Sequence, residues 1–100
     1  MSNQLSENIL VGGWTGYHPL SADDKKVFSE ALPTDVYHHV IYHPEKVATQ
    51  VVNGINYRFE CVASIPDGNV FWRAIVEIYL RPYLHGMPPP TPIVVGIIRQ

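Results

Sequence analysis

The chain has 100 residues, of which 46% are apolar and 16% charged, with a formal net charge of −2 and a single cysteine, Cys61. These values are typical of one small globular domain and exclude a disordered chain. The weak negative charge offers no basic field for a nucleic-acid backbone, and one cysteine provides neither an internal disulfide nor a zinc cluster. No apolar run approaches the ~18 residues that span a membrane. We expect one domain over residues 1–100 that binds neither nucleic acid nor membrane, and the cysteine content favours a cytoplasmic location.

The first 20 residues combine a polar tail with a short apolar segment. Residues 1–8 lack the basic and apolar regions of a signal peptide, and we expect them to form a flexible tail. The segment from Ile9 to Trp14 is apolar and contains the pair Gly12-Gly13, which is typical of a bend. A short first strand is the simplest interpretation of this segment.

A helix is predicted from Ser21 to Leu32. Ser21 is a favourable N-cap, and Asp24 three residues later provides most of a capping box. Pro33 ends the helix because its ring cannot continue the hydrogen-bond ladder. Apolar residues recur at helical spacing and predict a stripe that faces the core. The stripe consists of Ala22, Val27, Phe28, Ala31 and Leu32.

The sequence after Pro33 predicts β-structure. Residues 36–43 and 46–52, on either side of Pro44, are rich in β-branched and aromatic residues. Asn53-Gly54 is a strong hairpin signal because both positions of a two-residue turn favour positive φ and these residues tolerate it. We therefore predict that the chain reverses at Asn53-Gly54 and continues into a further strand.

Alternating residues predict the remaining strands at 55–63 and 70–80, and Cys61 falls on the apolar face of the first of these. A cysteine in that position is usually an inert packing residue. The last strand, at 93–98, is apolar enough that we expect it to be mostly covered. Short connections imply antiparallel pairing, and the single helix can cover one face. The sequence thus predicts an α+β fold in which a five-stranded antiparallel sheet packs against one helix.

Histidines raise the question of a catalytic or metal site. His38, His39 and His43 lie close together, and on one strand His39 and His43 would share a face. No carboxylate or thiolate has a clear spacing to complete a site with them, and no phosphate-binding loop or nucleophile elbow is present. We therefore expect no catalytic residue, metal or cofactor; an enzyme that depends on these histidines is the weakest alternative.

Apolar residues occupy three segments where polar residues are the rule. The first segment lies directly before the glycine pair near the N-terminus, and the second lies beside the predicted hairpin turn. The third is the loop at 81–92, which contains five prolines. The residues are Leu10, Val11, Val51, Val52, Tyr83, Leu84 and Met87. Exposed apolar side chains are favourable when another protein covers them. In a meander both turns lie at one end of the sheet, so the three segments predict a narrow binding edge that suits a cleft.

These segments resemble those of a known family, the cystatins, and most closely its stefin-like branch without disulfides. Gln50-Val51-Val52-Asn53-Gly54 is similar to the family's Gln-Val-Val-Ala-Gly first hairpin, and Leu10-Val11-Gly12-Gly13 is similar to its N-terminal trunk. The resemblance covers nearly the whole chain. It implies a five-stranded antiparallel sheet wrapped around one helix, and reversible, competitive inhibition of papain-like, cathepsin-type cysteine peptidases. In that family the trunk and two hairpin loops fill the active-site cleft as a wedge.

The resemblance also implies which residues contact the peptidase. Gly12 would be the hinge of the trunk, Leu10 and Val11 would enter the non-primed subsites, and the first hairpin would form the central wedge. Asn53 replaces the family's alanine, and the second loop lacks the Pro-Trp pair of many secreted cystatins and is richer in proline than the stefin pattern. The implied peptidase-binding residues are Leu10, Val11, Gly12, Gly13, Gln50, Val51, Val52, Asn53, Gly54, Tyr83, Leu84, His85 and Gly86.

Two alternatives follow from the same residues. Asn53 and the unusual second loop are also compatible with a non-inhibitory protein-binding module on a cystatin scaffold. We expect a monomer, but strain beside the first hairpin could be relieved if that hairpin straightened and two chains exchanged strands.

Overall fold

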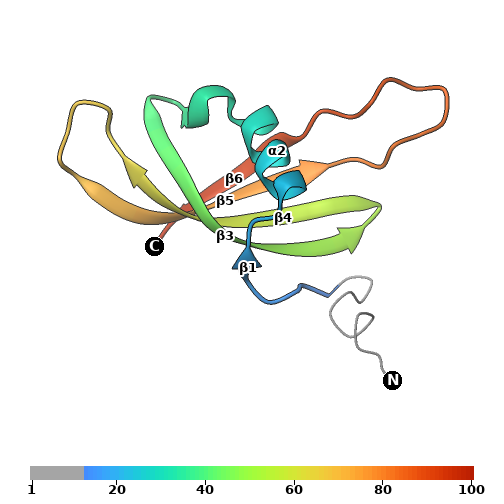
Figure 1. Ribbon diagram of the computed structural model, residues 1–100, viewed down its shortest axis with the longest axis horizontal. Helices are drawn as coiled ribbons and strands as arrows, with labels where there is room; N and C mark the ends of the chain where they lie inside the picture. The colour runs from blue at the N-terminus through green and yellow to red at the C-terminus, as the bar shows by residue number, and fades with distance from the viewer. Residues whose placement is uncertain (1–12) are drawn as a thin grey trace.

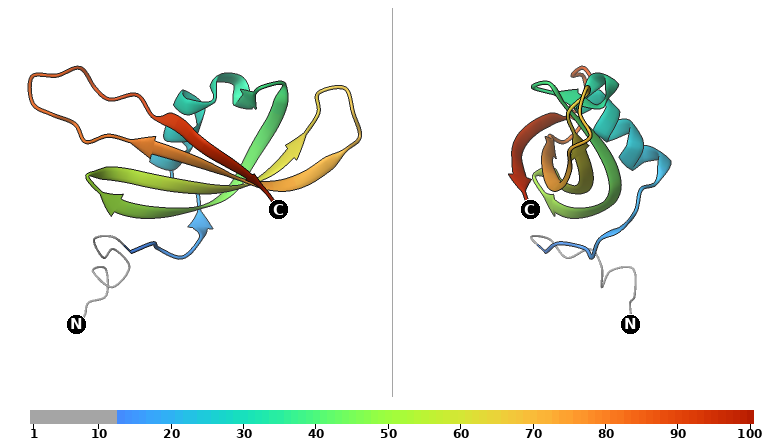
Figure 2. Two further views of the ribbon diagram at one scale, coloured as in Figure 1. Left: turned by 180° about the vertical axis from the view of Figure 1, so that it is seen from behind. Right: turned by 90° about the vertical axis from the view of Figure 1, so that its left-hand side faces the viewer.

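The structure, a computed structural model, describes residues 13–100. Within this range it is an α+β fold in which one α-helix crosses one face of an antiparallel sheet (Figures 1 and 2). The strand order is β1-β3-β4-β5-β6, with the short β2 paired to β3. The predicted α+β class is therefore confirmed. The elements are β1 (His18–Pro19), α2 (Ala22–Ala31), the 3₁₀-helix η1 (Pro33–Asp35), β2 (Val36–Tyr37), β3 (Val40–Val52), β4 (Gly54–Ser64), β5 (Phe71–Leu80) and β6 (Ile93–Arg99).

Helix α2 begins and ends as predicted, to within one residue. The Asp24 amide donates to the Ser21 hydroxyl over 3.1 Å, and the Ser21 amide donates to the Asp24 carboxylate over 2.9 Å. This reciprocal capping box satisfies backbone donors that the first turn leaves without a partner. The predicted apolar stripe is wrong at Ala22, which is exposed because it lies in the first turn beyond the edge of the core.

The core lies between α2 and one face of the sheet, which we call the inner face. Phe28 of α2 meets Phe59 of β4 edge-on, with ring centroids 5.0 Å apart, and Tyr57 stacks on Phe59 at 5.7 Å. Alternation in β4 and β5 directs every second side chain to this face. The buried cluster comprises Val27, Phe28, Leu32, Tyr42, Val47, Tyr57, Phe59, Cys61, Ala63, Ala74, Val76 and Ile78.

The strand predicted at 36–43 is interrupted by a turn. His38 and His39 have φ of 51° and 68°, and the chain reverses there so that β2 pairs with the start of β3. His39 and His43 therefore do not share a strand face, contrary to the prediction. Neither of these two positions holds glycine, asparagine or aspartate, the residues that most clearly signal positive φ in a turn.

Strand β3 runs without a break through Pro44. Its register to β4 shifts between Pro44 and Lys46, so Glu45 is an extra residue in a β-bulge. A proline is tolerated at such a point because it has no N–H to offer the ladder. The bulge also changes which alternate residues face the helix, and both Tyr42 and Val47 are buried in the core.

The last strand is less covered than predicted. β6 pairs with β5 on one side and with no other described strand. Ile93, Val95 and Ile98 are 54%, 57% and 48% exposed. Helix α2 covers the inner face of the sheet, and the other face, which we call the outer face, has no helix over it within residues 13–100. Apolar residues that β6 presents to the outer face therefore stay in contact with solvent.

Cys61 confirms the prediction that it faces the core. Its side chain is fully buried, and this burial raises the pKa of the thiol from 9.0 to about 12. In the unfolded chain the thiol ionises with its ordinary pKa. Above pH 9 the unfolded state therefore releases a proton that the folded state retains, and the free energy of unfolding must fall as pH rises.

We expect Cys61→Ala to reduce this alkaline loss of stability. Between pH 8.5 and 10 the free energy of unfolding of the parent should fall more steeply, by up to about 1.4 kcal/mol per pH unit, because one proton is involved. Urea unfolding of both proteins at several pH values measures the two slopes. Equal slopes in the parent and the variant would contradict the assignment of this effect to the Cys61 thiol.

Candidate functional site

The first hairpin joins β3 to β4 through a tighter reversal than predicted. Val52 pairs directly with Gly54, so Asn53 alone lies at the tip. Gly54 has a positive φ of 111°, whereas Asn53 does not take positive φ. The prediction that both residues would adopt positive φ is therefore wrong. Gly54 supplies all of the left-handed backbone that this turn needs.

The tip of the first hairpin is fastened to the neighbouring strand β5. The Tyr79 hydroxyl donates a hydrogen bond to the carbonyl of Asn53. Gly54 lies so close to β5 that a Cβ atom there would collide with the carbonyl oxygen of Leu80 and with the Tyr79 ring. Glycine is therefore required at position 54 both for its φ and for this close approach. The hairpin is held in one position before any partner arrives.

The residues of the predicted wedge divide between the two faces of the sheet. Val51 pairs with Ile55, which packs against the core, whereas Val52 belongs to the other alternate set and is 37% exposed. The side-chain oxygen of Gln50 accepts a hydrogen bond from the side-chain amide of Asn56 over 2.8 Å. Val52 and Asn53 are the most exposed residues of the hairpin, and Gln50, Val51 and Gly54 are partly exposed.

The second loop, residues 81–92, carries the other exposed apolar group at this end. Tyr83, Leu84 and Met87 are 63%, 53% and 50% exposed. The Met87 amide donates to the Leu84 carbonyl over 3.0 Å, and Gly86 has φ of 84°, so the outermost part of the loop is a turn. His85 lies in the same turn and is exposed.

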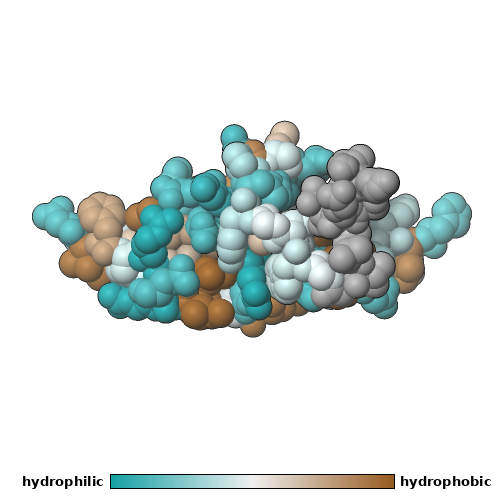
Figure 3. All heavy atoms as spheres, turned by 90° about the horizontal axis from the view of Figure 1, so that it is seen from below, coloured by the Kyte–Doolittle hydropathy of each residue, from teal (hydrophilic) through white to brown (hydrophobic). Residues whose placement is uncertain are grey.

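Both the first hairpin and the second loop project from the same end of the sheet (Figures 1 and 2). A cavity of about 330 Å³ joins their bases and is lined by residues of both, including Ile55 and Tyr83. In the view of Figure 3 a small apolar area is visible at this end beside hydrophilic surface, and larger apolar areas lie toward the middle and the opposite end. The structure thus brings together two of the three predicted segments.

The third segment is described in part. Leu10, Val11 and Gly12 lie outside the described residues. Gly13 is half-buried, and Trp14 forms an isolated antiparallel bridge with Gln50. Because Gln50 is two residues before Val52, the described chain begins at the hairpin end of the sheet. The predicted first strand differs from the structure in its described part: β1 is at His18–Pro19, and Trp14 makes a single bridge.

The histidines do not converge on a site. His38 and His39 occupy the β2–β3 turn, where the Tyr37 ring lies edge-on to His38 at 4.3 Å, and His43 is exposed on β3. No group of three or more His, Cys, Asp or Glu residues within 13–100 is arranged to hold a metal ion.

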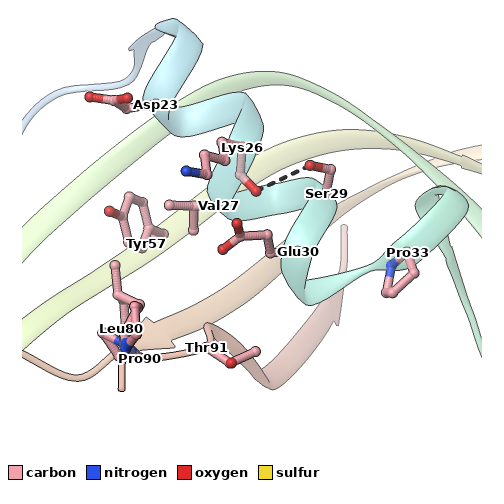
Figure 4. Close-up of a pocket in the computed structure, with 11 residues that line it drawn as sticks. Asp23, Lys26, Val27, Ser29, Glu30, Pro33, Tyr57, Leu80, Pro90 and Thr91 are labelled. Carbon is pink, nitrogen blue, oxygen red and sulfur yellow. Dashed lines mark hydrogen bonds between the residues drawn. The ribbon is translucent and has the colours of Figure 1, made fainter. Parts of the chain in front are cut away.

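A further cavity, of about 660 Å³, lies between α2 and the return of the second loop (Figure 4). Tyr57 and Leu80 lie at its base, and Pro90 belongs to the loop side. The helix contributes charged residues, among them Lys26 and Glu30. None of the residues predicted from the sequence to contact a partner lines this cavity. It separates the second loop from the helix, so the loop stands clear of α2 on this side.

In comparisons with known proteins, no family model, curated protein or solved structure matches the chain. No helix within residues 13–100 has the length and apolar character needed to cross a membrane.

Gly54→Ala tests how tightly the hairpin is fastened to β5, and Gly86→Ala is the matched control. Both glycines have positive φ, but a Cβ at position 86 would meet nothing within 4 Å. We expect Gly86→Ala to lower the free energy of unfolding by about 1 kcal/mol from backbone strain, and Gly54→Ala to lower it by about 1–3 kcal/mol more. Urea unfolding measures both values. Equal losses for the two variants would show that β5 does not confine the hairpin.

Proposed function

We propose that this chain is a reversible, competitive inhibitor of papain-like cysteine peptidases that uses a cystatin-like wedge. One observation carries the proposal: the Gln50–Gly54 hairpin, whose sequence resembles the cystatin first hairpin, lies at the same end of the sheet as the exposed second loop. Trp14, which follows the predicted trunk in the sequence, also lies at this end, where it bridges Gln50. The helix across one face of an antiparallel sheet is compatible with the cystatin fold.

The exposed side chains at this end supply the affinity. Val52, Leu84 and Met87 are between about one-third and one-half exposed in the free chain. Full burial of such a side chain is worth roughly 1.5–3 kcal/mol, and these residues gain part of that in a cleft. The hairpin is already held by Tyr79 and Gly54, so little conformational entropy is lost at that site on binding.

The geometry of the hairpin supports blocking of the peptidase cleft rather than cleavage of the chain or a covalent bond to the peptidase. A cysteine peptidase attacks a peptide bond that lies extended in its cleft. At the tip the chain reverses over Asn53, which does not present an extended segment. The buried Cys61 thiol cannot reach the catalytic cysteine of a peptidase, and its raised pKa keeps it protonated. The wedge would therefore block the cleft without being cleaved and without forming a covalent bond.

A non-inhibitory binding module on the same scaffold is the second candidate. It is favoured by the polar Asn53 at the tip, where the family has alanine, and by a second loop that extends well beyond the sheet (Figure 1). Such a module would use the same exposed residues on a partner that is not a peptidase. Inhibition of papain distinguishes the two candidates directly.

Val52→Asp should abolish most of the inhibition. We expect the parent to inhibit papain competitively with respect to a peptide substrate, and Val52→Asp to raise the inhibition constant by about tenfold or more, because a carboxylate would lose its hydration in the cleft. Steady-state inhibition at several substrate concentrations measures both effects.

Val36→Asp is the matched control, because Val36 and Val52 are both 37% exposed. Val36 lies in β2 and pairs with Ile41, whose partner in β4 is Ser64, at the opposite end from the hairpin. It should leave the inhibition constant unchanged. Parent protein that fails to inhibit papain or any cathepsin-type enzyme at micromolar concentration would refute the proposed function. Equal effects of the two substitutions would refute the hairpin as the contact.

A further inference from the structure

A stripe of paired side chains crosses the outer face of the sheet. The Arg58 guanidinium lies over the Trp14 ring, 4.2 Å from its centroid. Arg58 Nε donates to a carboxylate oxygen of Glu77 over 2.9 Å, and the two residues are register partners on β4 and β5. Glu77 in turn pairs with Gly96 on β6, where a Cβ atom would lie 3.0 Å from its other carboxylate oxygen. We call Trp14, Arg58 and Glu77 the outer stripe.

The outer stripe connects the N-terminal segment to the middle of the sheet. Trp14, on whose ring Arg58 stacks, is also the residue that bridges Gln50. The Thr15 amide donates to the Thr49 carbonyl over 2.8 Å, and the Thr49 amide donates to the Thr15 hydroxyl over 3.0 Å. The hydrogen bonds of Thr15 and the stack of Arg58 on Trp14 thus hold two adjacent residues of the segment.

The outer face is covered where this segment lies. Ala48 pairs with Arg58 and is 3% exposed, although it is not part of the core cluster under α2. Tyr17 is 39% exposed, but the next residue, His18, pairs with Val47 of β3, so the segment returns to the sheet there. The segment lies against the sheet over several residues.

The stack of Arg58 on Trp14 holds the N-terminal segment against the sheet but is not needed for the domain to fold. Arg58 and Glu77 have side chains 41% and 25% exposed, so solvent screens their ion pair in part. The stack of a partly exposed guanidinium on an indole is modest. Loss of Trp14 should therefore release the N-terminal segment without unfolding the domain, whose core lies on the other face.

We infer that Trp14 is a positioning residue for the wedge. Through Arg58 it fixes the point at which the chain leaves the sheet, beside Gln50 and the first hairpin. A segment attached at that point has a high effective concentration in the cleft that the hairpin enters, whereas a released segment must be ordered again on binding. This inference rests on the proposed function, in which Leu10 and Val11 contact the peptidase.

The test is a double-mutant cycle on papain inhibition with the full chain. The four proteins are the parent, Trp14→Leu, the pair Leu10→Ala with Val11→Ala, and all three substitutions together. We expect Trp14→Leu to raise the inhibition constant roughly three- to tenfold, in line with the loss of one such stack. In the Trp14→Leu background the two alanine substitutions should have much less effect than in the parent.

Conservative and matched variants separate positioning from general stability. Trp14→Phe retains an aromatic face and should keep most of the inhibition, whereas Arg58→Leu should behave as Trp14→Leu does. Trp72 has a similar stack, with Arg99 4.8 Å from its ring centroid, but pairs with Ala63 far from the hairpin. Trp72→Leu should leave the effect of the alanine substitutions at positions 10 and 11 intact.

Hydrogen exchange provides a readout that needs no peptidase. The amides of Thr15 and Thr49 should exchange several-fold faster in Trp14→Leu and should be unaffected in Trp72→Leu. Independent, additive effects of Trp14 and the trunk residues on the inhibition constant would overturn the inference. If the parent does not inhibit papain, the proposed function is refuted. Unchanged exchange of the Thr15 amide in Trp14→Leu would separately show that Trp14 does not hold the N-terminal segment on the sheet.

Discussion

A single helix can cover one face of a sheet, and this constraint determines how the rest of the chain is arranged. Phe28 and its neighbours on α2 fill the inner face, where all members of the core cluster lie. Within residues 13–100 no second α-helix is available for the outer face. Part of that face is covered instead by paired polar side chains and by the N-terminal segment, and the apolar residues of β6 remain exposed. Groups that could form a binding surface are therefore displaced to the edges and ends of the sheet.

The capping box and the alternation of β4 and β5 made much of the fold predictable. Ser21 and Asp24 form their capping box within one helical turn. From Tyr57 to Cys61, apolar and polar residues alternate, which indicates the side chains that face the core. These signals are local, so neighbouring residues suffice to read them. The same holds for the loop at 81–92, where prolines exclude regular pairing.

The differences arise where distant segments decide the conformation. His38 and His39 adopt positive φ without a residue type that signals it, because β2 must reverse there to pair with β3. Asn53 does not adopt the expected φ, since contacts with Tyr79 and Leu80 hold the tip of the hairpin. The exposure of β6 depends on which strand ends up at the edge of the sheet. None of these facts is contained in a short stretch of sequence.

The candidate site shows the same division. The residues at the hairpin and in the second loop could be named from their composition, because apolar side chains in turns stand out from neighbouring sequence. In the sequence Trp14 is only the end of an apolar segment, because its stack on Arg58 joins residues far apart in the chain. The hydrogen bond from Tyr79 to Asn53 also joins distant residues, so no local pattern indicates it. The residues proposed to contact a partner are thus easier to predict than those that hold them in place.

Strand β5 is the common reference for every described part of the proposed wedge. On its outer face Tyr79 holds the tip of the first hairpin, and two residues earlier Glu77 holds Arg58, on which Trp14 stacks. Its last residue, Leu80, leads directly into the second loop. A strand between two others cannot shift without breaking both ladders, so these attachments share one rigid support. Their relative positions follow from the register of β5, so the first hairpin, the second loop and the segment that begins at Trp14 have a common support in the proposed wedge.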